Sequence, residues 1–203
     1  MKLEYRTNIE VTSDKLVGII ESPTTIRVNT FTEESADKFH QSFIKASTSK
    51  QPIIPIIIDS YGGECDALLY MVDILKSSSK PVSTICVGKA MSCGAILLTC
   101  GWEGYRFCSE NSSIMIHDVA WGSRGKVGEL ESVSKEARRL NDKVYKIMAD
   151  NCGKHKKYFW DIVQSRGRSD WYLSAKEALA HNIINSVKIP NIKMNMSVEY
   201  IFD

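Results

Sequence analysis

Several common sequence features are missing from this chain of 203 residues. The N-terminus, MKLEYRTNIE, has no apolar core like that of a signal peptide, and no run of about 18 apolar residues could span a bilayer. The six cysteines include no C-x-x-C pair, and several lie in apolar runs, where a free thiol packs as a small hydrophobic group. These absences predict a soluble, cytoplasmic protein whose cysteines are reduced.

The chain also lacks an excess of charge and a nucleotide-binding loop. Lys and Arg total 26 against 24 Asp and Glu, a net charge of +2, so we expect neither nucleic acid nor a membrane as a partner. No G-x-x-x-x-G-K-[ST] motif occurs, and the chain therefore cannot bind ATP through a P-loop. With 43% hydrophobic residues it suits one globular domain, for which we expect no metal and no cofactor.

The stretch from Val82 to Cys100 is the most informative part of the sequence. A β-rich run ends near Gly88, and helix-compatible residues follow from Ala95, so Ser92 is predicted to lie at a strand-to-helix turn. A hydroxyl there is exposed, and the amide of Cys93 would point at whatever it attacks. Serines in such turns are common, however, so Ser92 taken alone is more simply read as a small turn residue.

A second turn precedes this one. The run PIIPIIID, residues 52–59, is apolar without alternation, which is typical of a strand buried on both faces of a parallel sheet. It leads into the sequence SYGG at 60–63 and then into a helix ending near Lys76. The two turns would therefore meet at the same carboxyl edge of a parallel sheet. The glycine pair would let backbone amides approach a ligand, although an ordinary turn explains it as well.

Two further residues could complete a nucleophilic site. An apolar strand, Ile114 to Ile116, runs directly into His117, which would lie at the same sheet edge and could accept the serine proton. Asp170 precedes the strand-like segment WYL and could orient the imidazole. Alone, each residue is more simply read as structural, because histidines after strands and carboxylates in loops are common.

Helices are expected at two other places. Apolar residues recur at helical spacing from Lys126 to about Asn151, which predicts a helix of roughly 35 Å that packs against a partner subunit or its own domain. Thr30 and Glu33 suggest a capping box for a helix over residues 31–47. A short strand is expected at Leu16 to Ile20.

Four segments together resemble ClpP, the proteolytic subunit family of the Clp proteases. They are, in order, SYGG at 60–63, GKAMSCGAILLTCG at 88–101, RFCSENSSIMIH at 106–117 and DWYLSAKEALAHNII at 170–184. The chain departs from this family in places. Tyr61 stands where proline is usual, Cys93 where methionine is usual, and Asp118-Val119 where Gln-Pro is usual, while Pro55 and Ile57 replace aromatic residues of an unfoldase-docking pocket.

The resemblance implies a crotonase-like α/β fold with a layered parallel sheet and a projecting handle helix. It implies a serine endopeptidase that cuts peptides and unfolded proteins inside a heptameric or double-ring (tetradecameric) chamber, with a separate AAA+ unfoldase. Ser92 would be the nucleophile, His117 the base and Asp170 its partner. The amides of Gly62 and Cys93 would form the oxyanion hole. The whole of residues 1–203 would be one domain, with an N-terminal segment at 1–23, a handle at about 122–152 and a tail at 188–203.

Three alternatives remain open from the sequence. The chain could be a catalytically silent or partner-activated ring subunit, or a crotonase-type enzyme that acts on a CoA thioester with the same oxyanion geometry. In the third, the thiol of Cys93 replaces the hydroxyl of Ser92 as the nucleophile.

Overall fold

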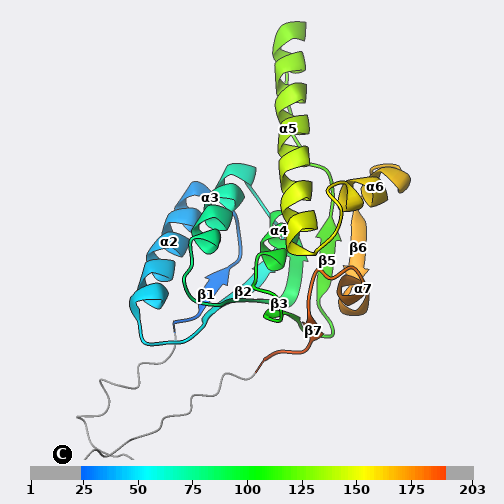
Figure 1. The fold of residues 1–203 in the computed structure, drawn as a ribbon. Helices are drawn as coiled ribbons and strands as arrows, with labels where there is room; N and C mark the ends of the chain where they lie inside the picture. Colours follow the sequence, from blue (N-terminus) through cyan, green and yellow to red (C-terminus); the bar gives the residue numbers. More distant parts are fainter. Residues whose placement is uncertain (1–23, 191–203) are drawn as a thin grey trace, which may run out of the picture.

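The computed structural model describes residues 24–190, which form a seven-stranded sheet with helices packed against it (Figure 1). The elements follow in the order β1 (Ile26–Val28), α2 (Glu33–Thr48), β2 (Ile54–Ser60), α3 (Cys65–Lys76), β3 (Val82–Met91), α4 (Cys93–Thr99), β4 (Arg106–Cys108), β5 (Ser113–Ile116), α5 (Val127–Asn151), α6 (Tyr158–Ser165), β6 (Trp171–Ser174), α7 (Ala175–Ala180) and β7 (Ser186–Val187). The predicted parallel progression of strands and helices through the middle of the chain is confirmed.

Strand β3 is the centre of the sheet. It pairs with β2 along one edge, and along the other edge it pairs first with β4 and then with β5. The parallel order is β1-β2-β3-β4-β7, and the end of β3 leaves β4 and pairs instead with β5, with Lys89 opposite Ser113 and Met91 opposite Met115. Strand β5 also pairs antiparallel with β6. This change of partner brings the ends of β3 and β5 side by side, where the sequence places Ser92 and His117.

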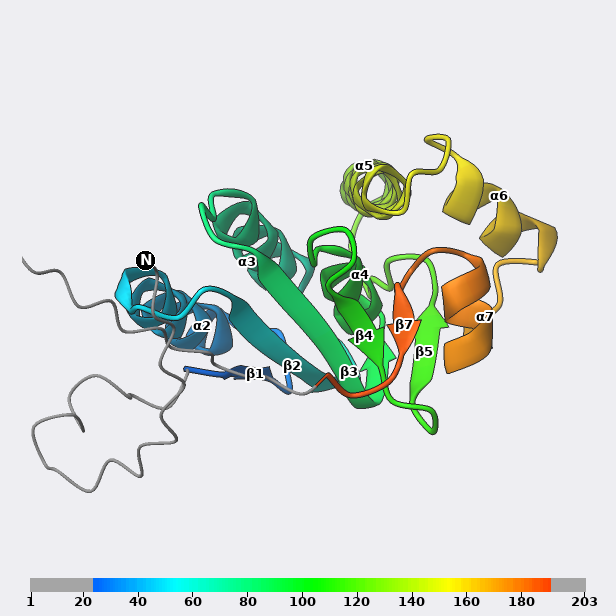
Figure 2. The same ribbon diagram turned by 60° about the horizontal axis from the view of Figure 1, so that its bottom comes forward.

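The apolar run of β2 is divided between the two faces of the sheet. Ile54, Ile56 and Ile58 are fully buried, and Figure 2 shows α2, α3 and α4 together on one side of the sheet. The alternate residue Ile57 is only half-buried and faces the other way. The prediction of a strand buried on both faces is therefore correct for the helix-covered face and only partly correct for the other.

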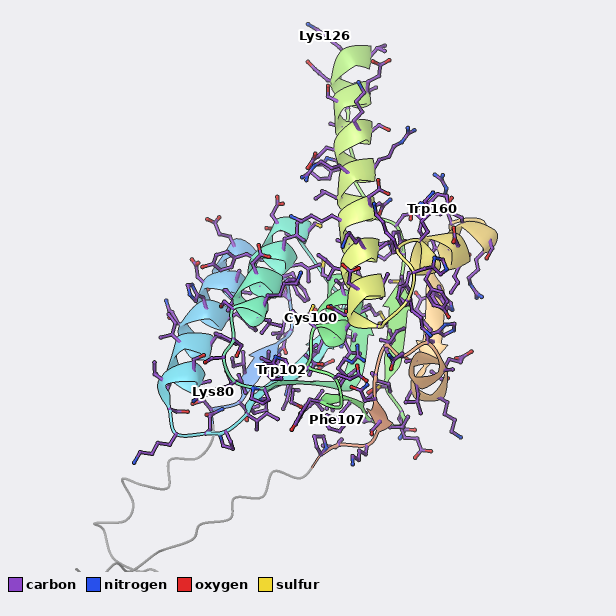
Figure 3. The ribbon with its side chains drawn as sticks, viewed as in Figure 1. Lys80, Cys100, Trp102, Phe107, Lys126 and Trp160 are labelled. Atoms are coloured by element: carbon purple, nitrogen blue, oxygen red, sulfur yellow. The ribbon has the colours of Figure 1, made fainter. Side chains whose placement is uncertain are left out.

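Helix α5 has two different halves. Its C-terminal half is buried against the domain through Leu140, Val144 and Met148. Its N-terminal half projects away from the sheet, with Lys126 at the far tip (Figures 1 and 3), and its apolar residues Val127 and Leu130 are 73% and 40% exposed. The long helix predicted from Lys126 to Asn151 is confirmed. Intramolecular packing explains its second half, and the first half has no covering among residues 24–190.

Helix α2 begins later than the sequence pattern suggested. Thr32 is the N-cap residue, and a capping box joins it to Ser35 rather than joining Thr30 to Glu33. The predicted box was wrong because the chain before Thr32 is held by the sheet: Phe31 forms a bridge with Gly63. The strand predicted at Leu16 to Ile20 lies outside the described residues. Within residues 24–190, no helix is long and apolar enough to cross a membrane.

Candidate active site

Ser92 occupies a strained elbow between β3 and α4. Its φ of 54° and ψ of −121° lie in a region that non-glycine residues rarely adopt, at a cost of about 1–3 kcal/mol. Backbone contacts hold it there, because its N–H donates to Met115 O at 2.8 Å and its carbonyl accepts from Ala95 N at 3.0 Å. Although Ser92 is the N-cap residue of α4, its hydroxyl makes no capping bond. The side chain is therefore not committed to holding the helix.

The glycine pair after β2 lies against Ser92. A Cβ added at Gly62 would be 2.7 Å from Ser92 Cβ and 3.2 Å from Ser92 Oγ, so a larger residue would clash with the candidate nucleophile. The Gly62 amide donates to Ser60 Oγ at 3.0 Å. The neighbouring Gly63 lines the same cavity as Ser92. The Gly62 amide therefore already has a partner within the turn, whereas Gly63 belongs to the wall of the cavity.

A cavity of about 570 Å³ opens at this point of the sheet edge. Ser92 and His117 both line it, which is the arrangement predicted from the two strand ends. The rest of its wall comes from the segment between β1 and α2, from the turn after β2 and the start of α3, from α4 and α5, and from the loop after β5. These wall residues are Thr30, Phe31, Thr32, Gly63, Glu64, Cys65, Asp66, Cys93, Ile96, Val119, Ala120, Trp121 and Val144.

Asp170 directly precedes β6 and is outside the lining of the cavity. The last pair in the antiparallel register of β5 and β6 is Ile116 opposite Trp171, and the same register continued by one residue would set His117 opposite Asp170. Within residues 24–190, no hydrogen bond joins the side chains of Ser92, His117 and Asp170. The two residues that follow His117, Asp118 and Val119, are hydrogen-bonded to α5. Catalytic hydrogen bonds are often long without substrate and tighten in the complex.

Cys93 is a poor candidate for the nucleophile. Its side chain is buried, its thiol donates to Gly63 O at 3.3 Å, and burial raises the pKa of the thiol. Only the thiolate attacks, so a raised pKa makes the residue unreactive near neutral pH. These observations disfavour the alternative in which Cys93 replaces Ser92. The backbone amide of Cys93, at the first position of α4, remains available to the proposed oxyanion hole.

Iodoacetamide is therefore expected to leave the activity almost unchanged. Besides Cys93, the cavity contains Cys65, whose thiol pKa burial raises to about 11. At pH 7.5 roughly one such thiol in 3,000 is ionised, so an hour's treatment should cost less than about 10% of peptide hydrolysis. Protein treated in urea and analysed by mass spectrometry, which should alkylate all six cysteines, is the control. Rapid inactivation accompanied by alkylation of Cys93 would reinstate the thiol as nucleophile.

Comparison with known protein families identifies the family of this chain. A model of the Clp protease family matches residues 12–190. The chain belongs to this family. The match covers the full parallel sheet, the elbow at Ser92 and helix α5, so the fold expected from the resemblance, an α/β layered sheet of the ClpP type with a projecting helix, is established. Clp protease membership also supports a peptidase that works as an oligomer with an unfoldase.

Several residues at the cavity of this Clp protease chain were not found from the sequence. Trp121 lines the cavity from an irregular segment that no periodicity distinguishes, and it is 54% exposed. Asp118 and Val119 were noticed only as departures from the family pattern, and their partners on α5 were not anticipated. Gly63 was recognisable from the glycine pair, but the sequence does not distinguish its amide from that of Gly62.

Proposed function

We propose that this Clp protease chain is a serine endopeptidase in which Ser92 is the nucleophile, His117 the general base and Asp170 the group that orients His117. The observation that carries the proposal is the strained elbow: Ser92, at φ 54°, shares a cavity with His117 and leaves its hydroxyl uncommitted. Strain retained at one polar residue beside a cavity is typical of a functional site.

The chemistry follows from these positions. His117 would take the proton of Ser92 Oγ as that oxygen attacks the substrate carbonyl, and would deliver it to the leaving amine. The oxyanion that forms would accept hydrogen bonds from the amide of Cys93 and from one amide of the Gly62–Gly63 turn. We expected Gly62 to supply it, but its existing bond to Ser60 favours Gly63. Water would then hydrolyse the acyl-enzyme with His117 again as base.

We further propose that the chain forms rings, heptamers or pairs of heptamers, that enclose the cavity, and that the exposed half of α5 contacts another subunit. Val127 and Leu130 are exposed on that half, and two neighbouring positions at the same helical spacing, Val133 and Ala137, extend the apolar stripe. Burying this stripe against a second copy would remove apolar surface from water.

An AAA+ unfoldase is the proposed partner, because the chain has no P-loop of its own. The sheet face without helices is the surface we propose for it. Arg27 and its register neighbour Ile57 are exposed and half-buried there, whereas Ile85 and Phe107, which continue the row across the strands, are buried. Figure 3 shows Phe107 at the end of the molecule remote from the tip of α5. Substrates would be peptides and unfolded proteins.

Labelling with a fluorophosphonate tests the proposed nucleophile directly. Such a probe reacts with a serine only when a base activates it, so the wild-type protein should be labelled at Ser92 and the variants Ser92→Ala and His117→Ala should not. Light scattering on the same samples gives the mass of the assembly. Absence of label in a wild-type protein of ring mass would contradict the proposal. It would favour the second candidate, a silent or partner-activated subunit, which is also favoured by the lack, within residues 24–190, of hydrogen bonds among the side chains of Ser92, His117 and Asp170.

A further inference from the structure

The two residues that follow His117 are fastened to helix α5. The hydroxyl of Tyr145 donates to Asp118 Oδ1 at 2.9 Å, and the backbone N–H of Val119 donates to Asn141 Oδ1 at 2.6 Å. Asn141 and Tyr145 are four residues apart and therefore lie on one face of the helix, one turn from each other. Two successive residues of the loop are thus bound by two successive turns of α5.

Both contacts are sheltered from water. Tyr145 is only 2% exposed, and Asp118 and Val119 are half-buried. Burial, and next the neighbouring Asp118 carboxylate, raise the pKa of Tyr145 far above its usual value, so its hydroxyl remains a proton donor at any physiological pH. A buried hydroxyl or amide that loses its partner is costly, which makes these bonds persistent.

His117 is thereby held on both sides. On its N-terminal side β5 pairs with β3 and β6, and Met115 O accepts the N–H of Ser92 at 2.8 Å, which ties the histidine strand to the nucleophile elbow. On its C-terminal side the sheet ends, and the bonds to Asn141 and Tyr145 are what continue the support. Without them, His117 would be the first residue of a loop with no support after β5.

We propose that Asp118, Asn141 and Tyr145 form a positioning clamp that holds the imidazole of His117 at the cavity containing Ser92. The clamp acts through the backbone of residues 118–119 and does not touch substrate. It rests on the proposed function, since it positions the general base of that reaction. A displacement of about 1 Å between a catalytic base and its nucleophile can cost up to about a hundredfold in rate, so small losses of support have a large kinetic effect.

Kinetics of four variants separate positioning from simple stability. Tyr145→Phe and Asn141→Ala, which remove one clamp bond each, should lower kcat for a short fluorogenic peptide by about tenfold with KM changed less than about twofold. Asp118→Asn and Asn141→Asp, which keep an oxygen acceptor, should remain within about threefold of wild type.

Tyr70→Phe is the matched control, because it likewise removes one tyrosine hydroxyl. That hydroxyl is hydrogen-bonded to His40 Nδ1 at 2.6 Å and joins α3 to α2, neither of which carries Asp118 or Val119. Its kcat should equal that of wild type. An equal fall of kcat in Tyr70→Phe and Tyr145→Phe would overturn the clamp, because the effect would then be one of stability alone. Unchanged kcat in both Tyr145→Phe and Asn141→Ala would overturn it as well.

Hydrogen exchange gives a reading that does not depend on activity. The amide of Val119 should be protected in the wild-type protein and should exchange at least about tenfold faster in Asn141→Ala, because its acceptor is lost. If the wild-type protein neither cleaves peptide nor reacts with fluorophosphonate, the proposed function fails, while the exchange rates still report whether the loop is clamped. Unchanged exchange at Val119 in Asn141→Ala would remove the physical basis of the clamp.

Discussion

Replacing Ser92 with alanine is expected to reduce hydrolysis of a short fluorogenic peptide to background, a fall in turnover of up to roughly a millionfold. The reason is that the nucleophile, base and orienting acid act as a unit, so loss of the attacking oxygen removes nearly all covalent catalysis. The measurement is initial rate at saturating peptide for both proteins, with light scattering to show that the assemblies have the same mass.

A second serine of the same strand provides the matched control. Ser83 in β3 is 3% exposed, and among the described residues its hydroxyl has no hydrogen-bond partner. Ser83→Ala should therefore leave turnover within about twofold of wild type, because no bond is lost. If Ser92→Ala continued to cleave peptide at a rate near that of Ser83→Ala, Ser92 would not be the nucleophile. If neither wild type nor variant cleaved in a confirmed ring, the silent or partner-activated subunit would be favoured.

Gly63→Ala is expected to destabilise the protein by about 3–5 kcal/mol and to abolish peptide hydrolysis. A Cβ at Gly63 would lie 2.4 Å from Phe31 O, a backbone atom that cannot rotate away, and the φ of +151° is itself unfavourable for alanine. The same carbonyl of Phe31 accepts the N–H of Glu64 at 2.8 Å. The clash would therefore separate the chain before α2 from the turn that faces Ser92.

Gly153→Ala isolates the cost of the backbone conformation. Gly153 also has a positive φ, +63°, but an added Cβ there has nothing within 4 Å, so only about 1 kcal/mol should be lost. Urea unfolding of both variants at one protein concentration measures the difference, since the stability of an oligomer depends on concentration. Equal midpoints for the two variants would show that the Gly63 turn yields without strain and need not be glycine.

The prediction of the central elements succeeded where the local pattern was strong. The run from Val82 and the apolar residues after Ser92 led to β3 and α4, and because the strand continues to Met91, the predicted turn consists of Ser92 alone. Ser174 and Glu177, three residues apart, form the capping box that begins α7, a pattern that can be read from the sequence itself. The box at Thr30 and Glu33 failed because Thr32 with Ser35 offered the same chemistry two residues on. The two-residue strand β7 has no signal of its own; it exists because Phe107 and Cys108 provide pairing partners.

The local sequence contained the residue types of the site and the strand ends that present them. Ser92 follows one apolar run, His117 ends another and Asp170 precedes a third, and the rule that parallel strands expose their carboxyl ends together was enough to group the first two. Tertiary structure decided the remainder. The backbone bond that holds Ser92 to Met115 and the bonds from α5 to Asp118 and Val119 join residues that are 22 to 27 positions apart in the sequence. Periodicity describes one element at a time, whereas these contacts arise only when packing brings separate elements together.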